Sequence, residues 1–395
     1  MALEVTGGVG IDWDPRSPDV LTDQVRAYDA MRALCPVAHG VQGNWTVFGH
    51  ADTVRMLEDH ETFSNVVSVH VAIPNGMDPP QHTAYRHVVE RYFTAERVAA
   101  FEPVCRAVAT ESIARFVATS GGDVMADLAE PFANALACAF MGWPSSMHEP
   151  LREWTRKSHR ATLAMDRDLL SQVALEFDGH IREQLELRRT LVGTPPDDAT
   201  TMLLAETVDG RPLTDEEIVA IVRNWTVGEL GTIAASVGIL IEFFATHPDV
   251  VGLLRGDSSL IDDAVDEILR IHAPLVSNRR RTTRPVTVAD REIPEGERVL
   301  VLWASANRDE RVFSDPDEFR LDRDPGDNLL YGRGIHVCPG APLARCELRV
   351  LVEELLAAVE QFTLLDGGRR EFAHYPAGGF AVLDVVVAEG FGRHG

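Results

Sequence analysis

The stretch that decides the fold reads Tyr331-Gly-Arg-Gly-Ile-His-Val-Cys-Pro-Gly-Ala-Pro-Leu-Ala-Arg345. Its glycines make a tight loop with few side chains, and such a loop lets the backbone approach a flat ligand closely. The residues from Ala341 to Val359 follow as a predicted long helix. Cys338 therefore lies just before a helix N-terminus, where free N–H groups and the helix dipole favour a thiolate over a thiol. An anionic sulfur in this position is a suitable axial ligand for iron.

This loop resembles the haem-binding loop of cytochromes P450, in which an aromatic residue precedes the pattern G-x-G-x-H-x-C-x-G. Glu267-Ile-Leu-Arg270 is similar to the family's E-x-x-R element, whose acid and base share one helix face and can pair. Ala306-Asn-Arg-Asp309 follows it in the family's order. Asp78-Pro-Pro-Gln-His-Thr-Ala-Tyr-Arg86 resembles the segment that enters the helix crossing the haem. The resemblance covers the chain from about Val20 to Leu383.

Helical periodicity dominates the sequence from about Val20 to Val265, where apolar residues recur at three- and four-residue spacing. Residues 215–244 show it clearly, and no charged or Pro/Gly/Ser-rich linker divides the chain. We predict a mainly α fold with small β-sheets (α+β), which is the cytochrome P450 fold that the resemblance implies. It is expected to form a single domain over residues 1–395, with 1–19 as a flexible N-terminal segment. Short strands are predicted at 43–48, 286–288, 298–303, 372–374 and 382–387.

A haem site must bind two propionates, supply an axial ligand and leave the opposite face open to oxygen and substrate. Arginine suits the propionates because its fork of N–H groups matches a carboxylate, and histidine can assist. By resemblance, His82 and Arg86, one helical turn apart, hold one propionate region. Arg280 and His336 serve the other region, with Arg281 as the alternative to Arg280.

The same resemblance assigns the iron and the remaining contacts of the cofactor, haem b. Cys338 is the expected axial ligand, and its thiolate favours cleavage of the O–O bond. Glu267 and Arg270 are expected to have a structural role. The loop residues expected to contact the haem are Tyr331, Gly332 and Gly340.

The family's central helix usually carries an acid directly before a threonine, beside the bound oxygen. Counting back from the turn at His247, the resemblance assigns Thr232 to the alcohol position and Gly231 to the acid position. Glu229 precedes Thr232 by three residues, so their side chains share a helix face. It is a candidate general acid, most usefully with a raised pKa in an apolar environment. The alternatives are that Glu229 pairs with an arginine, that it anchors a polar group of the substrate, or that the altered site favours hydrogen peroxide.

The resemblance places the substrate roof on largely apolar positions. A mainly hydrophobic cavity with few polar groups suits a small organic molecule. Ordinary core packing is the alternative explanation for each position. The candidates are the 65–77 loop, Trp225, Leu275, Val276 and Phe380.

Composition narrows the classes of partner. The chain has 395 residues, with 61 acidic and 37 basic side chains and a net charge of −24. This charge opposes binding to phosphate backbones and anionic membranes, so neither nucleic acid nor a membrane is expected as a partner. The N-terminus resembles no secretory signal, and the apolar stretches are too short or interrupted to span a bilayer, so we expect a cytoplasmic protein. Five scattered cysteines do not indicate a disulfide framework.

The leading interpretation is a haem-thiolate monooxygenase that inserts one oxygen atom from O2 into a small hydrophobic substrate by hydroxylation or O-dealkylation. A peroxide-using or oxidative-coupling enzyme is the alternative within catalysis, and a haem protein that senses a ligand without turnover is the alternative outside it. The resemblance implies that electrons come from a separate ferredoxin and its NAD(P)H-dependent reductase. The candidate basic face for such an acidic carrier comprises Arg91, Arg97, Arg333, Arg345 and Arg349.

Overall fold

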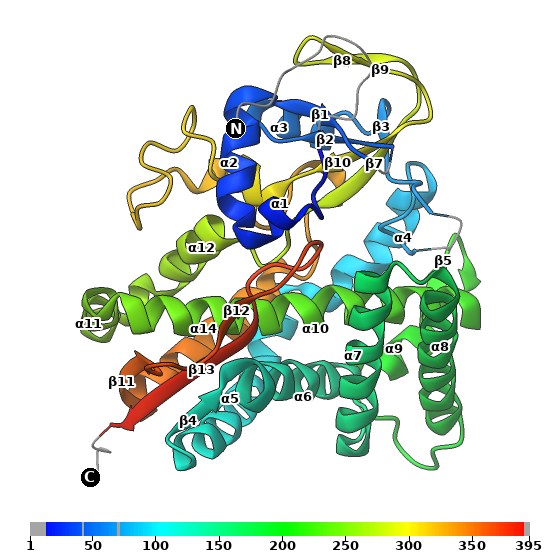
Figure 1. The fold of residues 1–395 in the computed structure, drawn as a ribbon. Helices are drawn as coiled ribbons and strands as arrows, with labels where there is room; N and C mark the ends of the chain where they lie inside the picture. The colour runs from blue at the N-terminus through cyan, green and yellow to red at the C-terminus, as the bar shows by residue number, and fades with distance from the viewer. Residues whose placement is uncertain (1–12, 42, 69–71, 391–395) are drawn as a thin grey trace.

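The structure is a computed structural model that describes residues 13–41, 43–68 and 72–390. Helices form the larger part of it, and a smaller part with the first helices and the largest sheet lies along one side (Figure 1). The α-helices are α1 (Pro18–Thr22), α2 (Gln24–Leu34), α3 (His50–Glu58), α4 (Gln81–Glu90), α5 (Ala95–Ala118), α6 (Glu130–Met141), α7 (His148–Ala164), α8 (Arg167–Arg189), α9 (Ala199–Ala205), α10 (Asp215–Thr246), α11 (Pro248–Gly256), α12 (Ile261–His272), α13 (Trp303–Ala306) and α14 (Ala341–Ala358).

The strands form small sheets, as predicted for an α+β chain. The largest has the order β1-β2-β10-β7-β3, and within it β2 and β10 run parallel while the other neighbours are antiparallel. A second sheet joins β4, β11, β12 and β13, and two hairpins complete the set. The strands are β1 (Val37–His39), β2 (Asn44–Val47), β3 (Phe63–Ser64), β4 (Gly121–Asp123), β5 (Thr207–Val208), β6 (Arg211–Pro212), β7 (Asn278–Thr282), β8 (Val286–Val288), β9 (Arg291–Ile293), β10 (Arg298–Val301), β11 (Val359–Leu364), β12 (Arg370–Phe372) and β13 (Phe380–Glu389).

The predicted strands agree with this set to different degrees. Strand β8 has the predicted bounds, and β2, β10 and β13 overlap their predictions over most of their lengths. The prediction at 372–374 is wrong by two residues, because β12 ends at Phe372. Strand β7 was not among the predicted strands. Its residues alternate, with Arg280 and Thr282 buried and Arg279 and Arg281 exposed.

The predicted N-terminal flexible segment is too long. Residues 1–12 lie outside the described residues, but Trp13 forms a β-bridge with Gly40 and is buried against Tyr28 and Phe48. Helix α1 then begins at Pro18, with the Ser17 side chain accepting a hydrogen bond from the Val20 N–H as an N-cap. Hydrophobic burial of Trp13 and the cap therefore hold this part of the chain in place.

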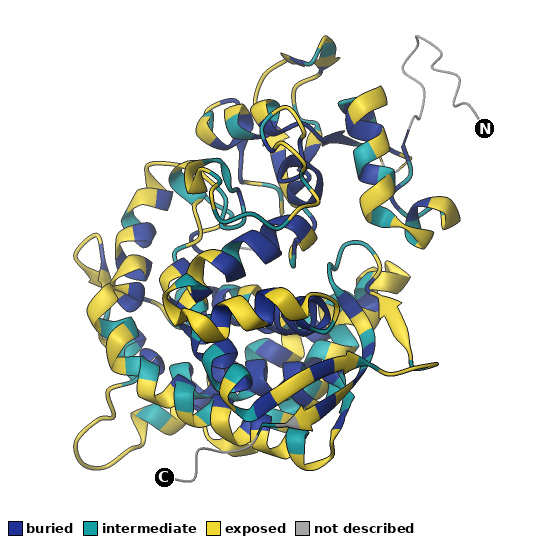
Figure 2. Cartoon of the chain, turned by 90° about the vertical axis from the view of Figure 1, so that its left-hand side faces the viewer, coloured by how far each residue is buried: buried dark blue, intermediate teal, exposed yellow. Residues whose placement is uncertain are grey.

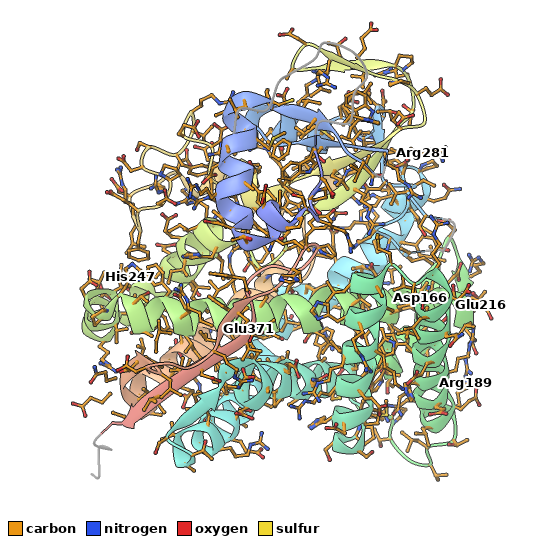
Figure 3. The ribbon with its side chains drawn as sticks, in the orientation of Figure 1. Asp166, Arg189, Glu216, His247, Arg281 and Glu371 are labelled. Atoms are coloured by element: carbon orange, nitrogen blue, oxygen red, sulfur yellow. The ribbon has the colours of Figure 1, made fainter. Side chains whose placement is uncertain are left out.

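Helix α10 crosses the middle of the molecule, with Glu216 near one end and His247 just beyond the other (Figure 3). A capping box starts it: the Glu217 N–H donates to the Thr214 hydroxyl, and the Thr214 N–H donates to the Glu217 carboxylate at 2.8 Å. By length and composition α10 could span a bilayer, but 72% of its apolar window is buried inside the protein. It is the core helix predicted from residues 215–244.

The main hydrophobic core surrounds α10. Helices α6, α8, α12 and α14 pack against α10, and α5 packs against α6 and α14. The residues between these helices are buried, while the outward faces of the surface helices are exposed (Figure 2). The second and third clusters of buried apolar side chains lie in the part that contains the five-stranded sheet and the first helices. The loop before α14 contacts the sheet-containing part, because its short helix Gly334–His336 packs against α3.

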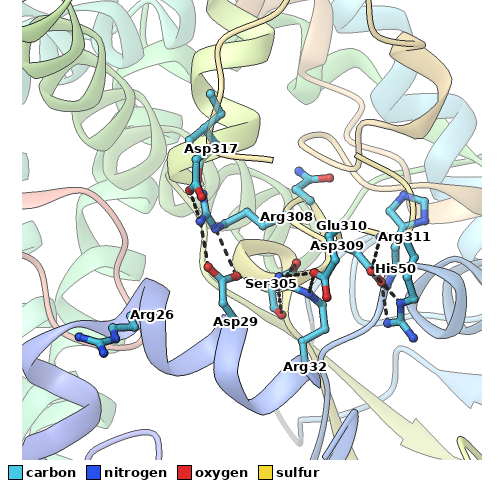
Figure 4. A network of polar contacts seen from close by, with 12 residues as sticks. Arg26, Asp29, Arg32, His50, Ser305, Arg308, Asp309, Glu310, Arg311 and Asp317 are labelled. Carbon is cyan, nitrogen blue, oxygen red and sulfur yellow. Dashed lines mark hydrogen bonds and ion pairs between the residues drawn. The ribbon is translucent and has the colours of Figure 1, made fainter. Parts of the chain in front are cut away.

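A network of buried charges joins α2 to the segment after α13 (Figure 4). Arg32 donates to Asp29 at 2.7 Å, to Glu310 at 2.8 Å and to the Ser305 carbonyl at 3.0 Å. Arg308 contacts Asp29 from the other side at 2.9 Å. Because both arginines are buried, their carboxylate partners offset a large desolvation cost.

Candidate functional site

The loop before α14 has the tight form that its glycines predict. Gly332 and Gly334 both have φ of +73°, and a Cβ on Gly334 would lie 2.2 Å from the Leu57 carbonyl oxygen. The backbone turns through the short helix Gly334–His336, and the Cys338 N–H donates to the Tyr331 carbonyl at 2.8 Å. Only glycine combines that conformation with such a close approach. The loop holds Cys338 immediately before α14.

The Cys338 sulfur accepts hydrogen bonds from the backbone N–H groups of Gly340 and Ala341. Pro339, between them, has no N–H to donate. Desolvation raises the pKa of the Cys338 thiol, and these N–H groups together with the Arg86 charge act in the opposite direction. Cys338 as a whole residue is exposed, while its thiol is desolvated by the surrounding protein. That environment suits a metal ligand, whose bound ion stabilises the thiolate directly.

Four basic side chains converge beside this loop. The His82 and His336 rings lie 4.3 Å apart, and burial, followed by the charges of His82, Arg280 and Arg86, lowers the pKa of His336 to about 3. The structure thus brings together side chains that were assigned to two propionate regions, and the division between the regions stays a prediction. His82, from α4, and His336, from the loop, are direct neighbours, and Arg86 and Arg280 act on the same group.

Arg86 ties α4 to the cysteine loop. Its guanidinium donates to the Val337 carbonyl and to Glu90, each at 2.7 Å. His82 and Arg86 are both buried on one side of α4, as their spacing predicts. The helix that carries two of the predicted haem contacts is thus fixed to the residue next to Cys338.

Arg280 and Arg281 point to opposite faces of β7. Arg280 is 3% exposed, whereas Arg281 is exposed and lies at the outer side of the sheet-containing part (Figure 3). Within the described ranges the Arg280 guanidinium donates to the Arg279 carbonyl at 2.8 Å and has no carboxylate at ion-pair distance. Burial lowers the pKa of Arg280 to about 10, with the Asp78 charge opposing. Between the two arginines, the geometry favours Arg280 as an anion-binding residue.

Several buried polar atoms of this region have no hydrogen-bond partner among the described residues, and they indicate whether a haem would fit here. The buried nitrogens without a hydrogen-bond partner in the structure include Nε2 of His82 and both ring nitrogens of His336. Buried polar groups and buried cations cost free energy unless a partner satisfies them. An anionic ligand here would accept hydrogen bonds from the N–H groups of Arg280, His82 and His336, and a metal would bind Cys338. Haem, with two propionates and an iron, has that chemistry.

Tyr331 contributes a ring and an unsatisfied hydroxyl. The Arg345 guanidinium lies 4.5 Å from the centre of its ring, and the hydroxyl is buried without a partner in the described structure. A Cβ built on the nearby Gly332 would lie 3.7 Å from the Trp303 ring. The Nε1 atom of Trp303 is also buried without a hydrogen-bond partner among the described residues. Sequence reasoning did not find Trp303, because a tryptophan after a strand reads as ordinary core.

The middle of α10 has an open side. A Cβ built on Gly228 or Gly231 would meet no atom within 4 Å, although most of the helix is buried. The Thr232 hydroxyl donates to the Gly228 carbonyl at 2.6 Å and lies 3.3 Å from the Glu229 carbonyl oxygen. The structure thus provides a small-residue opening with a threonine hydroxyl beside it, the arrangement expected of an oxygen-binding position.

The Glu229 carboxyl lies inside the protein. One of its oxygens is buried without a partner, and burial raises the pKa of Glu229 to about 8. The negative charge of Glu229 contributes to raising the pKa of three neighbouring groups. These are the Glu347 carboxyl on α14 and two buried thiols, Cys105 and Cys138. The alternative that Glu229 pairs with an arginine finds no support among the described residues. Sequence reasoning missed Glu347, although its spacing from Leu343 and Val350 places this acid on the apolar side of α14.

The predicted substrate residues have different surroundings. Trp225 packs against the rings of Tyr92 and Phe93, with centroids 4.9 and 5.4 Å away, and its indole nitrogen has no hydrogen-bond partner among the described residues. Leu275 is exposed and bridges to Ala377, whereas Val276 is buried in the third apolar cluster.

Phe380 lies under the Arg370 guanidinium, next to α10 at Gly238. The adjoining Gly379 would place a Cβ 3.3 Å from the Ala235 carbonyl, one turn beyond Thr232. Contact with substrate remains a prediction for Trp225, Leu275, Val276 and Phe380. Residues 69–71 of the predicted roof loop are outside the described residues.

The candidate basic face is not a set of free cations. Each of the five arginines meets an acid: Arg91 meets Glu206, Arg97 meets Asp197, Arg333 meets Glu58, Arg345 meets Asp266, and Arg349 meets Glu102. The local positive charge is therefore smaller than the arginines alone suggest.

Comparisons with known proteins agree with the geometry of this site. The family model described as Cytochrome P450 matches residues 137–368. Cyclomarin C epoxidase CymV of Salinispora arenicola is 33% identical over 79% of this chain and 82% of its own, and Cytochrome P450 130 of Mycobacterium tuberculosis is 33% identical over 86% and 89%. The structure of a mutant of P450 EryK in complex with erythromycin B matches with a TM-score of 0.83 and 29% identity, over 93% of this chain and 96% of that one.

Proposed function

The chain belongs to the cytochrome P450 family and is a haem-dependent monooxygenase, and on that premise we propose how its own residues serve the reaction. Cys338 would hold the haem iron through its thiolate. Arg280, with His336, His82 and Arg86, would bind the propionates. When bound, haem supplies the redox chemistry for oxygen activation, and thiolate ligation favours O–O cleavage. The observation that carries this assignment is a buried cluster beside the Cys338 loop, in which, among the described residues, histidine nitrogens lack hydrogen-bond partners and Arg280 lacks a carboxylate partner.

The substrate is proposed to be a small, largely hydrophobic organic molecule, oxidised by hydroxylation or O-dealkylation. Support comes from the apolar character of the candidate residues. Two similar proteins, Cyclomarin C epoxidase CymV and the P450 EryK mutant in complex with erythromycin B, are also named with organic molecules. The open side of α10 at Gly228 and Gly231 leaves room beside Thr232. Thr232 orients its hydroxyl through the Gly228 carbonyl, and Glu229 is the proposed proton source.

The test of this function begins with the reduced, carbon-monoxide-bound absorption spectrum. We expect a Soret band at the position typical of thiolate ligation, and a band typical of histidine ligation would overturn the Cys338 assignment. Aromatic, terpenoid and macrolide ligands are then screened for displacement of the iron-bound water. Turnover of a ligand that binds, measured as NAD(P)H consumed and product formed with a ferredoxin and its reductase, distinguishes a monooxygenase from a ligand sensor.

Electrons are proposed to arrive from a separate ferredoxin with its NAD(P)H-dependent reductase. Because each candidate arginine is paired with an acid, docking would rely on partly neutralised charge and would tolerate moderate salt. Two results together would favour the peroxide-using alternative. No added ferredoxin would change the rate at which the protein is reduced, and added hydrogen peroxide would support turnover. Gly231, in place of an acid next to Thr232, is the observation behind that alternative.

Arg280 and Arg281 offer a matched pair of variants for the propionate assignment. Arg280→Gln is expected to speed haem transfer to excess apomyoglobin by about tenfold to a hundredfold, since hydrogen bonds to charged groups contribute about 1.5–3 kcal/mol. Arg281→Gln, with the same change on the exposed face of β7, should leave the transfer rate near that of wild type. Equal rates for both variants would contradict the assignment.

A further inference from the structure

Two glutamates from different helices share the same buried region. Glu229 is on α10 and Glu347 on α14, and these helices contact each other. Glu347 is 1% exposed, and each carboxyl has one oxygen that is buried and has no hydrogen-bond partner in the described structure. A carboxylate normally accepts several hydrogen bonds when it is buried, so both groups lack the partners that ionisation requires.

No cation compensates this pair among the described residues. The arginines nearest to Glu347 along α14 are used elsewhere: Arg345 donates to Asp266 at 2.8 Å, and Arg349 donates to Glu102 and Glu353, each at 2.8 Å. The other titratable groups that interact with the two glutamates are the thiols of Cys105, Cys138 and Cys346 and the Tyr331 hydroxyl. These thiols are weak hydrogen-bond partners and carry no positive charge.

Two carboxylates in such surroundings cannot both be ionised. Burial is the main cause that raises the pKa of each, and for Glu347 the negative charge of Glu229 raises it further. Like charges that share a buried site push one proton affinity strongly upward. At neutral pH the two carboxyls therefore hold at least one proton between them. Both carboxyls are buried, and Glu229 precedes Thr232 by three residues on α10.

We propose that Glu229 and Glu347 form a proton-holding carboxyl pair, in which Glu229 delivers a proton toward Thr232 and Glu347 replaces it. The proposal rests on the proposed monooxygenase function and adds to it the source that reprotonates Glu229. When Glu229 loses its proton, the Glu347 carboxyl passes its own O–H proton to the Glu229 carboxylate. A proton from solvent then restores Glu347, so the pair returns to its starting state with no net change in charge.

Glu229 is the acid on the turn of α10 that precedes Thr232, since Gly231 offers none. The Thr232 hydroxyl donates to the Gly228 carbonyl at 2.6 Å and lies 3.3 Å from the main-chain carbonyl oxygen of Glu229. Glu347 acts only through Glu229, and it is therefore a positioning residue. Its effect should be seen in proton transfer and not in the binding of substrate.

The first test is infrared spectroscopy of the haem-loaded protein, which needs no turnover. We expect a C=O stretching band of a protonated carboxyl at pH 7 that shifts in D2O. The band should shift or disappear in both Glu229→Gln and Glu347→Gln. A control is Glu242→Gln, because Glu242 is also buried on α10 but has Arg370 as a cation partner. A spectrum that Glu347→Gln leaves unchanged would overturn the pair.

The second test measures product formed per NAD(P)H consumed, with any ligand that the wild type turns over. In Glu347→Gln the coupling is expected to fall by about tenfold or more, with a larger solvent isotope effect and an unchanged binding spectrum of the ligand, since positioned general acids contribute about 10²–10⁴-fold. Coupling as in wild type would overturn the relay while leaving the monooxygenase intact. Absence of turnover in the wild type would instead contradict the proposed function, and the infrared result would still decide the pair.

Discussion

Cys338→Ser is expected to abolish monooxygenase turnover and the thiolate-type Soret band of the reduced, carbon-monoxide-bound protein. Serine keeps the backbone of the loop, where the Cys338 N–H donates to the Tyr331 carbonyl at 2.8 Å. It replaces a soft anionic sulfur with a hydroxyl that stays protonated near neutral pH and donates little electron density to iron. The N–H groups of Gly340 and Ala341 would then face a neutral oxygen in place of the sulfur.

The measurement compares turnover and spectrum with those of Cys35→Ser. Cys35 is a half-buried thiol at the end of α2, where its sulfur lies 3.2 Å from the Val37 carbonyl, and it has no part in the proposed haem site. We expect Cys35→Ser to keep both properties and Cys338→Ser to lose both. A thiolate-type spectrum in Cys338→Ser would show that another cysteine binds the iron.

Local sequence rules were enough for the parts of the site that lie close together in the chain. The glycine spacing predicted the loop that carries Cys338, because a Cβ on Gly334 would collide with the Leu57 carbonyl. The helical spacing of Glu267 and Arg270 predicted their pairing, which the structure confirms at 2.7 Å. Long amphipathic or apolar segments, such as α10 and α14, were predicted within a residue or two of their ends.

Contacts between distant segments were beyond these rules. The approach of His82 to His336 depends on how α4 packs against the loop, which no local spacing specifies. Arg280 could be separated from Arg281 only once β7 was placed in a sheet, since alternation has meaning only with one face buried. Glu347 was missed for a related reason: a buried acid on α14 becomes informative only when Glu229 lies opposite it.

Glu267→Leu is expected to destabilise the haem-loaded protein by about 3–5 kcal/mol, the cost of leaving a buried charge without its partner. Its carboxylate accepts from Arg270 at 2.7 and 2.9 Å, from Arg323 at 2.9 Å and from the Arg320 N–H at 3.2 Å. Arg270 is 1% exposed, and its remaining donors hold the Asn307 and Pro316 carbonyls at 2.7 and 3.0 Å. The substitution would leave two arginine side chains without this carboxylate.

The free energy of unfolding from urea denaturation, with haem absorbance as a second probe, measures this loss. Asp322→Leu is the matched control, because Asp322 also pairs with an arginine, Arg320 at 2.8 Å, but it is 70% exposed. An exposed pair contributes about 0–1 kcal/mol, so the control should lose little. Equal losses in the two variants would show that burial does not set the strength of the Glu267 contacts. A loss confined to Glu267→Leu would show that this carboxylate fastens α12 to the segment leading to the cysteine loop.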